Sequence, residues 1–446
     1  MLQHRRTTII FLVAFSLVYV YKLCFTSRKK LGSLSWVRHG REDDYVMNST
    51  LGFEEIFVIN LPARRDRRDA VATAGAVSNL NLTFIEGLTG LTGDARSASS
   101  GARGSWASHM SALQTIVGLG LGSALVLEDD VDWDVRLKTQ MAAFAVASQT
   151  WLGVEQEKRE ILSRLRNLGT GNPQQEDSKA KSSVASNPFP DPNPNNERTV
   201  SEEFARDTIS LPPSLPESML GGTAHAESPY GEGWDVLWLG HCGADLPTAR
   251  QESLASTSRS PFCPPLKIAM NGDMTVPAPK HLQPHPFALR DALADAYPAH
   301  TRIVHAACGN VCSLGYAVSQ RGAQRLLRRF AEDGFAAQWD LMLRDYCMGK
   351  GKHTDGDGDG DEYGGDASLV CLTVQPPLIS HHYAGDGGGG GASVSDIRGQ
   401  GGGLVRGKKG TPYIRLSVQE NLERLVAGFP VARLVDQLPD DGGTLW

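Results

Sequence analysis

Three consecutive acidic residues end an apolar run in the sequence. Residues 124–127 read Ala-Leu-Val-Leu, and Glu128, Asp129 and Asp130 follow directly. A short apolar run of this kind predicts a buried strand, which would leave the carboxylates at an edge of a sheet. They are costly there unless they are solvated, paired or bound to a cation, and Mn²⁺ or Mg²⁺ prefers such oxygen ligands. The pattern therefore predicts a divalent-cation site, with acids of no special function as the alternative.

A second polar group follows an earlier apolar run, at residues 56–61. Asn60 lies at the end of that run, and Arg64 and Arg68 follow it four residues apart. An arginine placed after a strand can form paired hydrogen bonds with the phosphates of a ligand. The alternatives are a turn cap for Asn60 and a solvated helix face for the two arginines.

Other residues that could do chemistry lie farther along the chain. His109 could contact a ligand, or it could be a structural histidine held by hydrogen bonds. Asp340 is a carboxylate that could take a proton from an acceptor hydroxyl, or it could cap a helix over residues 341–346. Three more polar residues near the end of the chain could line the same site: His381, His382 and Asp396.

The elements that must position these residues alternate along the chain. Apolar runs predict strands and helical spacing predicts helices. The expected strands are residues 56–61, 82–86, 124–127, 234–240 and 314–318, and the expected helices are 64–77, 106–119, 320–330 and 341–346. This alternation predicts an α/β fold with a mostly parallel sheet flanked by helices, in which ligands bind at the carboxyl ends of strands.

Several motifs occur in an order that resembles the family 25 glycosyltransferases, which include lipopolysaccharide and procollagen galactosyltransferases. The motifs are Ile59-Asn60-Leu61 with Arg64 and Arg68, Gly104-x3-Ser108-His109, Leu127-Glu128-Asp129-Asp130, residues 235–240, residues 315–327, Trp339-Asp340, and residues 376–379 with 395–397. Each motif is short, and their common order carries the resemblance over residues 54–397.

The resemblance implies a GT-A-like nucleotide-sugar-binding fold and transfer of a sugar, with galactose expected, from a UDP-sugar to a glycan or glycoprotein acceptor. It implies Mn²⁺ or Mg²⁺ as cofactor. Asp130 is then the first choice of metal ligand and Glu128 the second, and Asp340 is the expected catalytic base. The residues expected to bind the donor are Asn60, Arg64, Arg68, His109, Glu128 and Asp129. The alternative is a catalytically inactive, lumenal carbohydrate-binding or scaffold protein on the same fold.

The N-terminus predicts a membrane anchor. Residues 7–25 are mostly apolar and have basic residues on both sides, which suits a membrane-spanning helix if Lys22 reaches the interface. A cleaved signal peptide and a buried helix are the alternatives. Residues 1–30 then form a stub and signal anchor and residues 31–53 a stem. We expect a single-pass type II protein of the Golgi or endoplasmic reticulum with its catalytic domain in the lumen. Glycosylation sequons at Asn48 and Asn81 fit that location.

The composition indicates which partners and which segments to expect in the rest of the chain. The 446 residues carry a net charge of -6, which argues against a nucleic-acid partner. Residues 54–154 and 233–446 are expected to form the transferase domain, and the Pro-, Asn- and Ser-rich residues 155–232 a disordered insert. Residues 354–366 read as a solvated acidic insert, with a calcium loop as the alternative. Six of the seven cysteines follow the anchor and allow up to three disulfides.

Overall fold

The computed structural model describes residues 46–89, 98–168, 202–212, 228–248, 263–285, 288–349, 369–384 and 409–445. The chain divides into a unit Met1–Arg41 and a unit Glu42–Trp446, and every described residue belongs to the second. The expected anchor at residues 7–25 lies outside the described residues, as does the acidic insert at residues 354–366. Among the helices in the described ranges, none has the length and apolarity needed to span a membrane.

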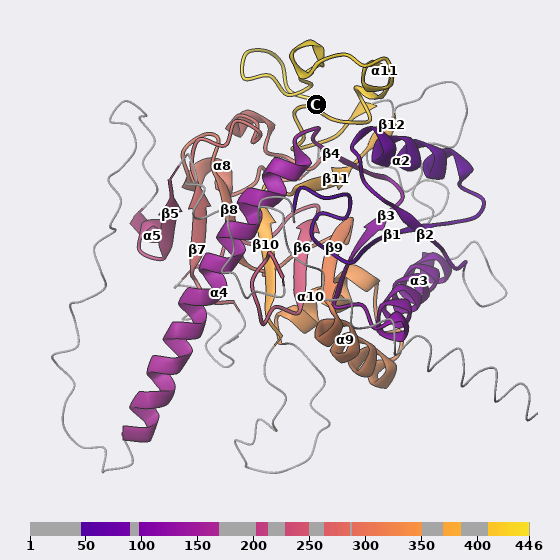
Figure 1. The fold of residues 1–446 in the computed structure, drawn as a ribbon. Helices are drawn as coiled ribbons and strands as arrows, with labels where there is room; N and C mark the ends of the chain where they lie inside the picture. Colours follow the sequence, from indigo (N-terminus) through magenta and orange to yellow (C-terminus); the bar gives the residue numbers. More distant parts are fainter. Residues whose placement is uncertain are drawn as a thin grey trace, which may run out of the picture. The chain divides into compact units, whose positions relative to one another are not determined.

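One large sheet organises the second unit (Figure 1). Its eleven strands are β1 (Glu55–Asn60), β2 (Thr83–Glu86), β3 (Ser123–Glu128), β4 (Val131–Trp133), β5 (Thr208–Leu211), β6 (Val236–Gly240), β7 (Lys267–Met270), β8 (Arg302–Ala306), β9 (Gly315–Ser319), β10 (Cys371–Gln375) and β11 (Ile379–His381). They lie in the order β2-β1-β3-β9-β6-β10-β8-β7-β5, and β11 connects β4 to β6. The five strands expected from the sequence correspond to β1, β2, β3, β6 and β9.

Most strands of this sheet run in one direction. The pairs β1–β2, β1–β3, β6–β10, β6–β11 and β5–β7 are parallel. The antiparallel pairs all involve β9, β8 or β4, which run opposite to the others. The carboxyl ends of β1, β3 and β6 therefore lie at the same edge of the sheet. The predicted α/β class with a mostly parallel sheet is confirmed.

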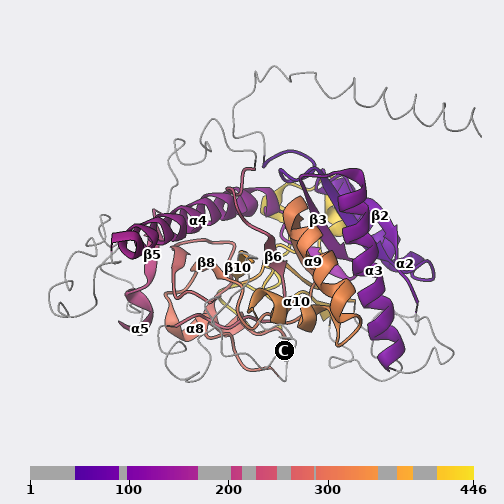
Figure 2. The same ribbon diagram turned by 90° about the horizontal axis from the view of Figure 1, so that it is seen from below.

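Helices cover both faces of the sheet, because alternate side chains of each strand point to opposite faces. The long helices are α2 (Arg65–Val77), α3 (Ala98–Leu119), α4 (Leu137–Leu168), α9 (Gln320–Asp333) and α10 (Trp339–Cys347). Ala124 and Val126 pack with α3, α9 and α10, whereas Leu125 and Leu127 pack with α2 and α4. Figure 2 shows α3 and α9 running side by side.

Shorter elements complete the unit. They are α5 (Glu202–Ala205), α8 (Leu293–Ala296), α11 (Leu422–Val426), the 3-10 helices Pro279–His281 and Val431–Arg433, and the pair β12 (Tyr383–Ala384) with β13 (Lys409–Gly410). The last segment, residues 409–445, lies at the edge of the sheet that carries β4 and β11 (Figure 1).

The predicted disordered insert, residues 155–232, contains folded parts, so its boundaries are wrong. Residues 155–168 continue α4, and residues 208–211 form β5, which pairs in parallel with β7. The first stretch is rich in Glu, Lys, Arg and Leu, which favour helix and so extend a helix already anchored in the core. Residues 169–201 and 213–227, which make up most of the remaining insert, lie outside the described residues.

The six cysteines that follow the expected anchor form three disulfides. They are Cys242–Cys312, Cys263–Cys308 and Cys347–Cys371. The first two tie the segments after β6 and before β7 to the connection between β8 and β9. The third ties the end of α10 to the start of β10.

Candidate functional site

The acidic triplet lies at the carboxyl end of β3, beside the carboxyl end of β1. The two strands are parallel, and Ile59 lies opposite Glu128 in their register. Four buried apolar residues, 124–127, fix β3 in the core, and the chain turns at Asp129 and Asp130 before β4. The acids consequently lie where the sequence predicted them, at an edge of the sheet and next to Asn60.

Asp129 is held by a neighbouring amide and a guanidinium. The Asn60 side-chain amide donates to Asp129 Oδ2 at 2.7 Å, and it also donates to the Arg64 carbonyl at 3.0 Å. Arg67 Nη1 lies 2.9 Å from Asp129 Oδ1 and 2.9 Å from Asp130 Oδ2. Burial and the charge of Asp130 raise the pKa of Asp129, while Arg67 acts in the opposite direction. Asn60 is therefore a partner of the acids as well as a brace for the turn that follows β1.

Arg67, which the sequence analysis did not single out, is the arginine that reaches the acids. Arg64 instead pairs with Asp66 at 2.9 Å, and the Arg68 guanidinium lies 4.4 Å from the centre of the Phe84 ring. Arg67 precedes the buried Val71 by one helical turn, which places it on the inward face of α2. That spacing is the signal that would have identified it.

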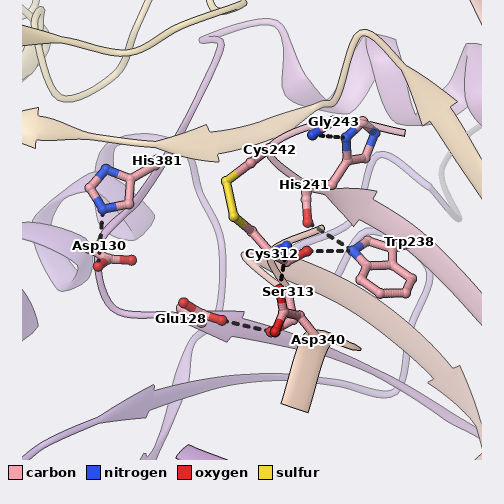
Figure 3. The surroundings of a disulfide bond; sticks show 11 residues. Glu128, Asp130, Trp238, His241, Cys242, Gly243, Cys312, Ser313, Asp340 and His381 are labelled. Atoms are coloured by element: carbon pink, nitrogen blue, oxygen red, sulfur yellow. Dashed lines mark hydrogen bonds and ion pairs between the residues drawn. A yellow bond between two sulfur atoms is a disulfide. The ribbon is translucent and has the colours of Figure 1, made fainter. Parts of the chain in front are cut away.

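Asp130 has a second partner, His381, on β11. His381 Nε2 lies 3.4 Å from Asp130 Oδ2, and the two side chains face each other in Figure 3. Burial opposes ionisation, but the charges of His381 and Arg67 outweigh it and hold the pKa of Asp130 well below its usual range. The other oxygen, Asp130 Oδ1, is buried and makes no hydrogen bond to any described group. Of the four carboxylate oxygens of Asp129 and Asp130, this one has no hydrogen-bond partner among the described residues.

Glu128 lies on the side of the triplet away from Arg67. Ser313 Oγ donates to Glu128 Oε1 at 2.8 Å. Burial, followed by the negative charges of Asp130, Asp340 and Asp129, raises the pKa of Glu128 to about 8. The Glu128 side chain as a whole keeps 25% of its exposure. A carboxyl group of this kind can hold or release a proton near neutral pH.

Asp340 reaches the same place from a distant part of the chain. It lies in the first turn of α10, whose N-cap is Gln338, so the expected cap of a helix starting at residue 341 is wrong. Its Oδ2 accepts the Cys312 N–H at 2.8 Å. The neighbouring residue, Ser313, bonds to Glu128, and the charge of Asp340 acts on that carboxyl. Glu128 and Asp340 thus form an acid pair joined by residues 312–313 (Figure 3).

His109 lies beneath Glu128 as part of an aromatic cluster. Its ring stacks on Trp339 at 4.7 Å between centroids, and Nδ1 is 3.0 Å from the Tyr316 hydroxyl. Burial lowers the pKa of His109 to about 3, and Nε2 is 3.9 Å from Glu128 Oε1. These contacts favour the structural alternative for His109, as a neutral support for the floor of the site.

His382 belongs to a different cluster from its neighbour His381. Its Nδ1 lies 3.8 Å from Asp132 Oδ2 and 3.0 Å from Thr411 Oγ1. Asp132 is fully buried and also accepts from the Ser417 hydroxyl and the Gln419 N–H. This cluster fastens the C-terminal segment to β4. Asp396, the third residue expected near the end of the chain, lies outside the described residues.

A cation would find only part of the triplet open. In the described ranges no three His, Cys, Asp or Glu side chains form a group arranged to hold a metal. Both Asp129 oxygens are taken, by Asn60 and by Arg67. Asp130 Oδ1 has no partner and Glu128 is partly exposed, so these two carboxylates fit a divalent ion, which prefers oxygen ligands.

Comparison with known proteins adds no family. A scan against protein-family models and a search of curated proteins gave no match to this chain.

A separate cavity of about 210 Å³ lies far from the acids. It is bordered by α4 and by the start of β10, including Trp151, Lys158 and Cys371. Because β10 runs parallel to β6 and β3, this cavity is at the opposite edge of the sheet. The acid site contains the cluster of carboxylates that could do chemistry, whereas the cavity offers space without such a cluster in its described lining.

Proposed function

We propose that this protein is a metal-assisted glycosyltransferase that moves a sugar, with galactose expected, from a UDP-sugar to a glycan or glycoprotein acceptor. The observation that supports it is the meeting of four carboxylates, Glu128, Asp129, Asp130 and Asp340, from two distant chain segments at the carboxyl end of β3. Carboxyl ends of strands are where α/β sheets bind ligands. The fold class and the resemblance to family 25 glycosyltransferases are consistent with a GT-A-like domain.

Asp130 and Glu128 are the residues that would hold Mn²⁺ or Mg²⁺. Asp130 offers an oxygen without a partner, and Glu128 offers a carboxyl group on a partly exposed side chain. When bound, the ion would offset the negative charge that develops on the departing UDP. Arg67 keeps Asp129 and Asp130 in place and adds positive charge at the same edge, which also favours a diphosphate.

Asp340 is the proposed base for the acceptor hydroxyl. One of its oxygens accepts the Cys312 N–H, and Oδ1 makes no hydrogen bond to the rest of the described chain. A carboxylate held by one oxygen presents the other in a fixed direction, which suits proton transfer from a bound hydroxyl. Glu128 and Asp340 have environments that separate their roles: burial and like charges raise the pKa of Glu128, so that a bound cation would displace its proton, and the backbone N–H orients Asp340.

The proposed location is the lumen of the Golgi or endoplasmic reticulum, with residues 7–25 as a type II anchor. Three disulfides suit an oxidising compartment. Asn81, in the second sequon, is exposed, whereas the Asn48 side-chain oxygen is bonded to Thr50 and Gly52. The disulfides and the exposed sequon at Asn81 support a lumenal domain.

Removal of single carboxylates tests the proposed reaction. Asp130→Asn and Asp340→Asn should each lower kcat/KM for hydrolysis of UDP-galactose in Mn²⁺ by about 100-fold or more, as loss of one charge-stabilising group does in other enzymes. The surface variant Asp295→Asn, whose partner Arg290 is also solvent-exposed, is the matched control and should keep full activity. Wild-type rates in both site variants would remove the catalytic role.

A carbohydrate-binding or scaffold protein is the second candidate. It is favoured by the ion pairs of Arg67 with both Asp129 and Asp130, which offset part of their charge without any ligand. This candidate predicts that the wild-type chain hydrolyses no UDP-sugar with any divalent metal. It also predicts that glycan binding, measured on a glycan array, is the same in Asp130→Asn as in the wild type.

A further inference from the structure

A disulfide lies directly behind the acid pair. Cys312 is bonded to Cys242, and the residue's own backbone N–H is the group that holds Asp340 (Figure 3). We propose that the Cys242–Cys312 disulfide is a positioning element of the site: it fixes the turn at residues 311–313, whose amide and hydroxyl groups orient Asp340 and Glu128. This inference rests on the proposed function, because it concerns the same two acids.

The backbone at Cys312 is in a conformation that needs support. Its φ is 62°, in the left-handed region that non-glycine residues adopt only at an energetic cost. Three contacts hold it there: the disulfide, the N–H bond to Asp340 Oδ2, and the Cys312 carbonyl, which accepts from Trp238 Nε1 at 3.0 Å. Such conformations persist only where the surroundings over-determine them. Without the covalent bond, hydrogen bonds would have to hold this conformation of Cys312.

The turn controls Glu128 as well as Asp340. Ser313 Oγ donates to Glu128 Oε1, and the Glu128 N–H donates to the Leu314 carbonyl at 3.0 Å. A change of φ at Cys312 would therefore move the donor to Asp340 and the donor to Glu128 together. The two acids come from chain segments more than 200 residues apart in the sequence, and residues 312–314 are the link that both of them contact.

The Cys242 end of the disulfide is a firm anchor. Cys242 follows β6, and its N–H donates to the Val311 carbonyl at 2.8 Å. The preceding residue, His241, is buried and lies 2.9 Å from the Val374 carbonyl of β10. The disulfide thus ties the turn to the centre of the sheet, beside the strands that carry the acids.

The Cys347–Cys371 disulfide provides a matched control. It joins the far end of α10 to the start of β10, and neither cysteine forms any of the hydrogen bonds found for Glu128 or Asp340. Its loss removes a covalent cross-link from the same unit, and neither cysteine bonds to residues 311–313. The comparison separates positioning of the acids from general stabilisation by a disulfide.

The experiment compares full-length double variants. Cys242→Ala/Cys312→Ala should lower kcat for UDP-galactose hydrolysis by about 100-fold, the scale expected for a displacement near 1 Å, with KM for the donor unchanged. Hydrogen–deuterium exchange should rise in the peptide containing residues 311–314 and stay unchanged in β3 and β6. Cys347→Ala/Cys371→Ala should keep kcat and the slow exchange at residues 311–314.

A third variant tests whether backbone conformation is the reason. In Cys242→Ala/Cys312→Gly, glycine adopts a positive φ with little cost, so kcat should recover about tenfold relative to the alanine pair. Equal kcat in the glycine and alanine pairs, or an equal loss in the control pair, would overturn the inference.

The exchange measurement does not depend on turnover. A wild-type chain without hydrolytic activity, in which the alanine pair still loosens residues 311–314 alone, would disprove the proposed function and leave the structural link intact. Unchanged exchange at residues 311–314 in the alanine pair would disprove the link itself.

Discussion

Buried acidic residues lie at both ends of the strands of the large sheet, at the amino ends and at the carboxyl ends, but the two groups have different partners. At one edge Asp235 precedes β6 and is fully buried. Its oxygens meet Arg321 Nε at 2.8 Å and Arg325 Nη1 at 2.9 Å, and the Val370 N–H donates to it at 2.9 Å. One carboxylate there has two guanidinium partners, so its charge is more than balanced.

At the opposite ends of the strands, the carboxylates outnumber their cationic partners. Because β3 and β6 both run antiparallel to β9, the acids that follow β3 lie at the other edge from Asp235. Among the described residues, Glu128, Asp129, Asp130 and Asp340 meet there with Arg67 and His381. A buried carboxylate that is fully paired with cations has a structural role. In a cluster with more carboxylates than cations, the carboxylates raise one another's pKa values, and such a cluster is suited to binding a ligand.

The largest effect is expected from breaking the balanced edge. Asp235→Ala leaves two arginines facing a buried site, and removal of one partner of a buried pair costs about 3–5 kcal/mol. We expect a loss near the lower bound, because Arg321 is 54% exposed and can turn to solvent. Urea denaturation of the variant and of Asp340→Asn measures it. A loss below about 1 kcal/mol would show that this edge is no more structural than the other.

Removal of Arg67 should give the next largest effect. Arg67→Met leaves Asp129 and Asp130 without their shared cation, and we expect a loss of about 2 kcal/mol in the free energy of unfolding, because His381 still pairs with Asp130. Mn²⁺ should restore part of that loss, since a ligand that binds only the folded chain stabilises it.

Thermal denaturation with and without Mn²⁺ checks this prediction, and Arg68→Met is the matched control from the same helix. A melting temperature of the Arg67 variant that does not respond to Mn²⁺ would contradict a cation site at these acids and favour the scaffold candidate.

Glu128→Gln should change how stability depends on pH. The folded-state pKa of Glu128 is raised from 4.5 to about 8, so the folded chain binds a proton that the unfolded chain has released. Stability is then lost as the pH rises from about 4.5 to 8, because the unfolded state holds fewer protons over that interval. The variant cannot titrate, so this part of the loss should disappear.

The size of that effect is set by solvent exposure. The Glu128 side chain keeps 25% of its exposure and interacts with the charges of its neighbours, which reduces the effect. We expect the change in the free energy of unfolding between pH 5 and pH 8 to differ by about 1–2 kcal/mol between wild type and variant. The exposed variant Glu332→Gln is the control. Parallel stability curves for Glu128→Gln and wild type would mean that the carboxyl group is as well solvated as any at the surface.

The sequence predicted the acid edge because its signals are local. An apolar run followed by acids needs only neighbouring residues to be recognised, so β3, β1 and the positions of Glu128 to Asp130 follow from it. The strands β7, β8 and β10 were not predicted, and Thr208–Leu211 was assigned to a disordered insert. Those segments are short, and β5 is ordered by its pairing with β7, which a single sequence does not reveal.

The difference between the two edges could not be predicted. Asp235 and Asp130 are both acids beside apolar runs, and what separates them is the set of arginines that reach them. Arg321 and Arg325 come from α9, nearly 90 residues away in sequence from Asp235. Arg67 rather than Arg64 or Arg68 reaches the acid triplet because of the helical phase of α2, which depends on where that helix begins. Partner choice of this kind is a tertiary property.

The smallest effects are expected from the two arginines that the sequence singled out. Arg64 pairs with an aspartate that is 53% exposed, and Arg68 lies over Phe84 at the surface. Contacts of these kinds contribute about 0.5 kcal/mol or less. Arg64→Ala and Arg68→Ala should therefore leave the free energy of unfolding nearly unchanged.

The same variants decide which arginine serves the donor. KM for UDP-galactose should rise in Arg67→Ala and stay within about twofold of wild type in Arg68→Ala, because a charge that the solvent screens contributes little to binding. A larger rise for Arg68 than for Arg67 would mean that α2 presents its outer face to the diphosphate. Arg67 would then serve only to offset the charge of the acids at this end of the strands. The difference between these acids and Asp235 would be one of degree.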